Sequence, residues 1–223
     1  MKDSPDLIIG ADQLCRAAAD GQLRVAAFLL DHGANINDGK KENMDLDLSR
    51  GDTPLVTAVK RNRQSMIEFL LDRGADANLD AGNDSALFVA AQKGYETCAE
   101  ILLAHKADIN VPHRDSKETP LFVACEKGFT NLVNLFLTHG ADVNAANNYG
   151  STPLLKVVQD GQLPLARMLL SATRYYSKLC PIPISLKLFL TRVRKLIRLS
   201  TTRGRRHYAR LLARTMPIRW ASC

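Results

Sequence analysis

Apolar and polar positions recur with a fixed period along residues 11–172. A ten-residue block of mostly apolar residues opens with Thr-Pro-Leu or a close variant, and its four clear copies start at Thr53, Ser85, Thr119 and Thr152. Successive starts lie 32, 34 and 33 residues apart. A second string, HGADVN or a variant of it, keeps the same phase and ends at Asn37, Asn78, Asn110 and Asn144. In the clear copies, the Gly of this second string, or the Lys in its place, lies 21 residues after the start, as Gly74 does after Thr53. The same interval counted back from Gly33 places a degenerate start at Asp12, so the pattern predicts five repeated units.

Each unit predicts two helices. Thr caps the first helix, and Pro is tolerated in the first turn, where its missing N–H has no partner to lose. The helix ends at a residue that accepts a left-handed backbone, which is Gly94, Gly128 or Gly161, with Asn62 in the same slot. The second helix carries apolar residues at i, i+3 and i+4. We expect these apolar side chains to be buried between units: Ile67, Leu70, Leu102, Leu103, Val133, Phe136, Leu137 and Leu169.

The period and its internal spacing resemble the ankyrin repeat, a turn followed by two antiparallel helices. The resemblance covers residues 11–172 and implies an all-α solenoid of helix–turn–helix units with projecting turns. Two features depart from the family pattern. The family's usual His after Thr-Pro-Leu is replaced by Val56, Phe88, Phe122 or Leu155. An insertion of about eight residues falls within 38–50 and predicts a lengthened loop.

Charge divides the chain into two parts. Residues 1–173 hold 17 Lys and Arg against 23 Asp and Glu, a balance of −6, whereas residues 174–223 hold 13 Lys and Arg and no acid. We therefore expect a repeat domain over 1–173 and a basic tail, helical in one interpretation, over 174–223. The first residues contain no apolar stretch of signal-peptide length, and no run is long enough to span a bilayer, so we expect an intracellular, cytoplasmic protein.

Candidate catalytic and metal-binding chemistry is sparse. Three histidines (His32, His105, His139) share one place near the end of the second helix, where the helix dipole favours His. They fall in different units, too far apart to meet at one zinc ion. The acids Asp76, Asp108 and Asp142 recur once per unit, which indicates turn chemistry. Cys98 and Cys125 fall on core-facing positions, which favours reduced thiols over disulfides. We expect no enzyme, cofactor, metal or small-molecule substrate.

A repeat stack binds through the positions that vary between its units. The resemblance places these positions at the turn tips and at the outer end of each first helix. The tip residues are Asp52, Asp84, Glu118 and Ser151, with the aromatic Tyr149 beside the last of them. The helix-end residues are Lys60, Arg61, Gln92, Lys93, Glu126, Lys127, Gln159 and Asp160. We expect this set to bind another protein, with the chain acting as a scaffold or adaptor.

Four interpretations of residues 174–223 stay open. The string CPIPISLKLFL resembles part of the suppressor-of-cytokine-signalling box, which would make the chain a substrate receptor of a cullin-type ubiquitin ligase. That resemblance assigns the cullin-facing role to Pro181, Pro183, Leu186, Lys187, Phe189 and Leu190, although the elongin-binding half of the box is missing ahead of them. Alternatively, the tail is an amphipathic basic helix for an anionic membrane or for nucleic acid.

The remaining two interpretations give the tail no partner. Its apolar face covers the end of the fifth unit, since a terminal repeat needs a cap. Otherwise it arises from a truncated or shifted reading frame and has no evolved function. We expect that deleting 174–223 leaves the repeat fold intact and mainly lowers nonspecific binding to polyanions, whereas unfolding on deletion would favour the capping interpretation.

Overall fold

The computed structural model describes residues 11–39, 51–79 and 84–177. Ten α-helices lie in these ranges, as five consecutive pairs. The pairs are α1 (Ala11–Asp20) with α2 (Leu23–Asp31), α3 (Pro54–Lys60) with α4 (Gln64–Asp72), α5 (Ala86–Lys93) with α6 (Glu96–Ala104), α7 (Pro120–Lys127) with α8 (Thr130–Thr138), and α9 (Pro153–Gln159) with α10 (Leu163–Ser177). The five units predicted from the sequence are confirmed.

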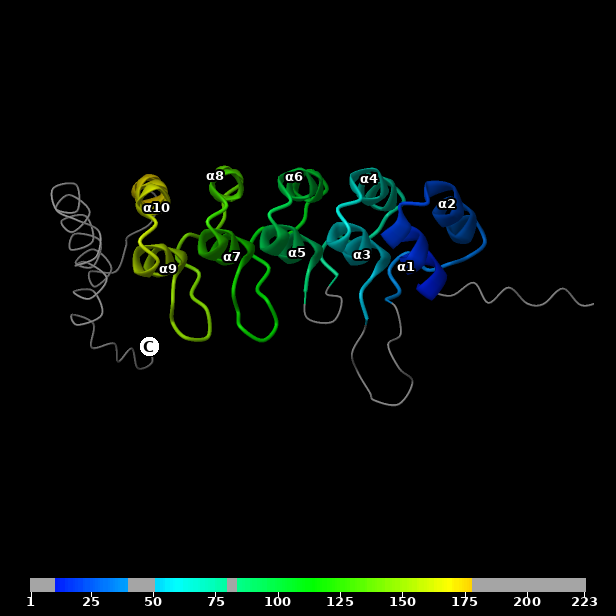
Figure 1. The fold of residues 1–223 in the computed structure, drawn as a ribbon, viewed down its shortest axis with the longest axis horizontal. Helices are drawn as coiled ribbons and strands as arrows, with labels where there is room; N and C mark the ends of the chain where they lie inside the picture. The colour runs from blue at the N-terminus through cyan, green and yellow to red at the C-terminus, as the bar shows by residue number, and fades with distance from the viewer. Residues whose placement is uncertain (1–10, 40–50, 80–83, 178–223) are drawn as a thin grey trace, which may run out of the picture.

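The pairs stack into an elongated solenoid with two rows of helices (Figure 1). The first helices of neighbouring units pack on one another from α1 to α9, and the second helices do so from α4 to α10. The two fully described connections between units, before α7 and before α9, project to one side of the row of first helices (Figure 1). This is the all-α repeat solenoid that the spacing predicted.

Helix ends follow the capping residues of the sequence. The side-chain oxygens of the four caps, Thr53, Ser85, Thr119 and Thr152, each accept the backbone N–H three residues on, at 3.3 Å. At the other end, Gly94, Gly128 and Gly161 have φ between 71° and 78°, and Asn62 has φ of 53°. These left-handed residues end the first helix and reverse the direction of the chain, so that the second helix can begin.

The core runs through all five units as one cluster of apolar side chains. Among the residues expected to be buried, Ile67, Leu70, Leu102, Val133, Phe136 and Leu169 are all fully buried. The expectation is wrong in degree for Leu103 and Leu137, which are partly buried and pack against the cluster from its edge. Both directly follow a fully buried residue, and one helical step of 100° turns a side chain away from the interface.

A hydrogen-bond ladder joins the turns that follow the second helices. Within a unit, the Asp carboxylate accepts the backbone N–H of the Asn two residues on, for example Asn110 N–H to Asp108 Oδ1 at 2.9 Å. Between units, the Asn side-chain oxygen accepts the backbone N–H of the next unit's Asp. These rungs are Asn37 to Asp76, Asn78 to Asp108, and Asn110 to Asp142, at 2.9, 2.6 and 2.8 Å. The turn chemistry expected of these residues is confirmed.

Three features predicted from the sequence fall partly or wholly outside the described residues. Residues 40–50 of the predicted loop are outside, as are the ubiquitin-ligase-like segment 180–190 and the rest of the tail from residue 178. Helix α10 continues to Ser177, across the predicted boundary between 173 and 174. The division of the chain at that boundary therefore stays a prediction.

Candidate partner-binding surface

The turn before α9 presents a strongly exposed aromatic side chain. Asn147 organises this turn, because its Oδ1 accepts the backbone N–H groups of Tyr149 and Ser151, each at 3.0 Å. The Asn147 amide also donates to Glu118 Oε1 at 3.3 Å. With the backbone of the turn held in this way, the Tyr149 ring projects outward and is 87% exposed.

The turn before α7 uses a histidine in the role of Asn147. The Nδ1 atom of His113 accepts the Ser116 backbone N–H at 3.2 Å. The other ring nitrogen, Nε2, lies 3.4 Å from Asp84 Oδ1, and the ring packs on Phe88 with centroids 4.9 Å apart. Asp84 is one of the predicted tip residues, so the structure turns it toward the next unit. Sequence analysis missed His113, although it stands three residues after Asn110 as Asn147 stands three residues after Asn144.

The side chains of Asp84, His113 and Ser116 contact one another in series, as an acid, a histidine and a serine do in a hydrolase triad. One ring nitrogen of His113 faces Asp84, and the other, Nδ1, is 3.2 Å from Ser116 Oγ. The bonds around them belong to the turn. The Ser116 backbone N–H shares Nδ1 with the hydroxyl, and Ser116 Oγ accepts the Glu118 backbone N–H at 3.3 Å. We therefore assign these three residues to holding the turn.

Most acids of the predicted surface are engaged in pairs. Lys60 Nζ lies 2.7 Å from Asp52 Oδ1, which joins a tip residue to a helix end within one unit. Lys156 Nζ lies 3.2 Å from Glu126 and 3.5 Å from Asp160. The hydrogen bond that Lys156 donates to Glu126, together with the charge of Asp160, raises the pKa of Lys156 above its ordinary value. Together with Asp84 and Glu118, these pairs account for every acid in the predicted set.

Three bases of the set remain available to a partner. Arg61, Lys93 and Lys127 are exposed, and their side chains form no ion pair or hydrogen bond with any residue in the described ranges. The neutral residues Gln92 and Gln159 are exposed beside them. The predicted surface is therefore mixed in composition, but its accessible charge is basic.

The recurring histidines are engaged in their own helices. His32, His105 and His139 follow α2, α6 and α8, and each ring Nδ1 bonds the backbone oxygen four residues back, at 2.7, 2.9 and 2.9 Å. The bond to Ile101 and the nearby Asp72 raise the pKa of His105 above its ordinary value. In the parts of the chain that the structure describes, no group of three His, Cys, Asp or Glu side chains is arranged to hold a metal ion.

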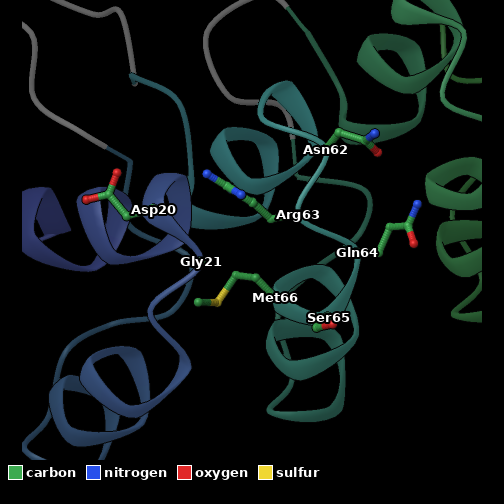
Figure 2. Close-up of a pocket in the computed structure, with 7 residues that line it drawn as sticks. All are labelled: Asp20, Gly21, Asn62, Arg63, Gln64, Ser65 and Met66. Carbon is green, nitrogen blue, oxygen red and sulfur yellow. The ribbon is translucent and has the colours of Figure 1, made fainter.

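An open hollow of about 450 Å³ lies between the loops of the first two units. Figure 2 shows Arg63, from the loop between α3 and α4, reaching across toward Asp20 and Gly21. Its Nε donates to the Ala19 backbone oxygen at 3.1 Å, so this guanidinium serves to join the loops. We assign the hollow no chemistry beyond that junction.

Buried thiols and helix lengths bear on the remaining site classes. Cys98 and Cys125 are free and fully buried, and desolvation raises the pKa of Cys98 to about 11 and that of Cys125 to about 12. Both are reduced thiols, as expected, and the Cys98 thiol also donates a hydrogen bond to Asn62 Oδ1 at 3.1 Å. None of the described helices has the length and apolar character needed to cross a bilayer.

Comparison with known proteins points to one family. A family model described as ankyrin repeats, in three copies, matches residues 14–113 and 111–178. The chain is 33% identical over 104 residues to the ankyrin repeat and KH domain-containing protein mask of Drosophila melanogaster, which covers 45% of the chain and 2% of that protein. It is 33% identical over 104 residues to human ankyrin repeat and KH domain-containing protein 1, over 45% of the chain and 4% of that protein.

A third relative has a different domain composition. The ankyrin repeat, SAM and basic leucine zipper domain-containing protein 1 of Carollia perspicillata is 32% identical over 104 residues, covering 44% of the chain and 20% of that protein. The chain thus spans a small part of each of these relatives. The similarity describes the repeats and leaves the other domains of those proteins aside.

Proposed function

The chain belongs to the ankyrin-repeat family, and from this premise we propose that it is a non-enzymatic scaffold or adaptor that binds a protein partner through its turn tips and first-helix ends. Ankyrin repeats are in general protein–protein interaction modules. Members of the family typically have no catalytic activity. The partner is a protein, and the proposal needs no cofactor or metal.

The contrast between repeated and varied positions is the observation that supports this proposal. Repeated residues are buried or form the caps and the ladder, as Thr119 and Asn110 do. Varied residues such as Arg61, Lys93 and Tyr149 are exposed, with side chains free of described partners. A rigid backbone that presents varied, unpaired side chains on one side is suited to recognising another macromolecule.

Affinity capture with a matched pair of variants tests the proposal. The surface variant replaces Arg61, Lys93, Lys127 and Tyr149 with Ala. Lys60 is kept, because its loss would leave Asp52 without its ion-pair partner. The control replaces Arg24, Lys106 and Arg167, which are exposed on or after the second helices, with Ala. Circular dichroism establishes that both variants are folded before capture.

Proteins captured by the wild type are identified by mass spectrometry, and the strongest is then purified for titration. We expect the control to retain this partner and the surface variant to lose it, because truncating central interface side chains removes most of the binding energy. Equal affinity of all three proteins for the purified partner would show that the surface is assigned wrongly.

A further inference from the structure

One surface position carries a regular pattern of charge across the five units. It is the residue directly before the left-handed end of each first helix, occupied in order by Asp20, Arg61, Lys93, Lys127 and Asp160. The three middle units thus present cations, and the two outer units present carboxylates. We call Arg61, Lys93 and Lys127 the basic row.

The fold does not explain the basic row. A cation near a helix C-terminus is favoured by the helix dipole. However, Asp20 and Asp160 stand at the same position of α1 and α9, so the position does not require a cation. Nearby bases such as Lys60 and Lys156 neutralise neighbouring carboxylates, whereas the basic row has no described partner. Its charges therefore face solvent or a ligand.

We propose that the basic row binds a short acidic segment of a partner protein, held in a polyproline II conformation with a carboxylate at every third residue. This inference rests on the proposed function and specifies the chemistry of the partner. Each cation receives one carboxylate, and the segment runs along the stack from α3 to α7.

Spacing selects this conformation. Helices of neighbouring units pack about 8–10 Å apart. Polyproline II has three residues per turn and rises about 3.1 Å per residue, so side chains three apart share one edge at about 9.3 Å. In a β-strand, side chains on one face are about 6.6 or 13 Å apart. Of these two extended conformations, polyproline II alone matches the interval between successive cations.

Length and flanking charge favour a peptide over nucleic acid. Three cations at this interval span about 16–20 Å, or about seven residues of an extended peptide. Beyond the first-unit end of the row, Asp20 would repel an anion that continued along the same line, and beyond the other end Asp160 is paired with Lys156 and adds no free cation. A nucleic acid strand carries charge without interruption, and its binding gains from a long basic track. The row fits a short segment that ends where its charges end.

Fluorescence anisotropy with a labelled heptapeptide tests the proposal. The probe is Glu-Pro-Pro-Glu-Pro-Pro-Glu, and the control peptide, Pro-Pro-Glu-Glu-Glu-Pro-Pro, has the same composition with adjacent charges. At about 0.02 M salt, where screening is weak, we expect the spaced peptide to bind more tightly. Replacing Arg61, Lys93 and Lys127 with Ala should weaken its binding about 3- to 100-fold, from about 1.5- to 5-fold for each exposed ion pair.

The variant with Arg24, Lys106 and Arg167 changed to Ala has the same net charge as the basic-row variant and should bind the spaced peptide like the wild type. Equal binding of both peptides, or equal binding by the basic-row variant, would overturn the proposal. Tighter binding of a thymidine oligonucleotide of about 30 residues that is lost in the basic-row variant and kept in the control variant would instead identify the row as a nucleic-acid surface. Changing Asp20 to Asn should increase oligonucleotide binding, since it removes the repulsion at that end of the row.

Comparison with the captured partner separates the two proposals. If that partner is lost with Tyr149→Ala and retained by the basic-row variant, the scaffold function stands and the acidic-segment inference fails. If the spaced peptide binds the basic row while the surface variant binds the captured partner as tightly as the wild type does, the scaffold assignment fails and the recognition chemistry stands.

Discussion

The first unit and the inner units place similar apolar residues at the same point of their second helices, with very different burial. Val25, the third residue of α2, is 44% exposed, whereas Met66 and Cys98, the third residues of α4 and α6, are 1% and 0% exposed. Leu132 and Leu165 repeat the inner pattern at 0% and 3%. No described helix precedes α1, so Val25 lacks the neighbour that covers its counterparts. In such a stack, a side chain on the face between units is buried only where a neighbouring unit covers it, so its burial depends on the position of its unit in the row.

The largest expected effect compares Leu132→Ala with Val25→Ala. Leu132 is fully enclosed, so its truncation should lower the free energy of unfolding by about 2–5 kcal/mol. Val25→Ala removes a side chain that is already half in water, and should cost about 1 kcal/mol or less. Urea denaturation followed by circular dichroism measures both. Similar losses at the two sites would mean that the outer face of α2 is covered in solution.

Thiol reactivity gives a second comparison at the same helix position. Burial raises the pKa of Cys98 to about 11, so its thiolate at neutral pH is about 100-fold scarcer than at the ordinary value of 9.0. A cysteine introduced as Val25→Cys should react rapidly with Ellman's reagent, and Cys98 should react slowly until urea opens the stack. The assay uses a background with Cys180 and Cys223 changed to Ser. Equal rates at the two positions in native buffer would contradict the burial pattern.

The same thiols predict a pH dependence. A folded-state pKa above the unfolded value means that folding favours the protonated thiol, so this stabilisation is complete below about pH 9 and is lost as pH rises through 11 and 12. We expect the midpoint of urea unfolding to fall between pH 9 and 11 more steeply in the wild type than in a Cys98→Ala, Cys125→Ala variant. Parallel pH profiles would rule out the thiols as the cause.

The smallest expected difference concerns helix starts. Thr119 caps α7 through its hydroxyl, and Thr119→Ala should cost about 0.5–2 kcal/mol. In the first unit, Asp12 lies inside the first turn of α1, where a carboxylate is worth about 0.3–1 kcal/mol through the helix dipole. Asp12→Ala should therefore lower the thermal midpoint less than Thr119→Ala does. Thr119→Ser keeps the hydroxyl and serves as the control.

Local chemistry made most of the fold predictable. Thr53 and Ser85 mark helix starts, and Gly94 and Gly128 mark helix ends, because a cap or a left-handed backbone acts within a few residues of its own position. Leu103 was misjudged because a helical pattern fixes a face to within about one residue and does not fix its edges.

The candidate surface was predictable only as a set of positions. In the sequence, Lys60 and Arg61 are equivalent basic residues, whereas in the fold Lys60 bonds Asp52 and Arg61 is free. The pairing of Asp84 with His113 joins two units, and the different residue types hide the common role of His113 and Asn147, which stand at the same place in their units. Contacts between units depend on how the turns lie side by side, and that information is absent from any single repeat.

The ladder of the turns gives the stack a direction. In every rung between units the asparagine oxygen belongs to the earlier unit and the backbone N–H to the later one, as for Asn78 and Asp108. In a dimer with a two-fold axis, two chains that contact each other through their first units would bring the same end of each ladder face to face. The ladder could not continue from one chain into the other. Head-to-tail contact would continue it, and such contacts produce open chains of subunits unless a rotation closes them into a ring. Any assembly that extends this ladder is therefore polar.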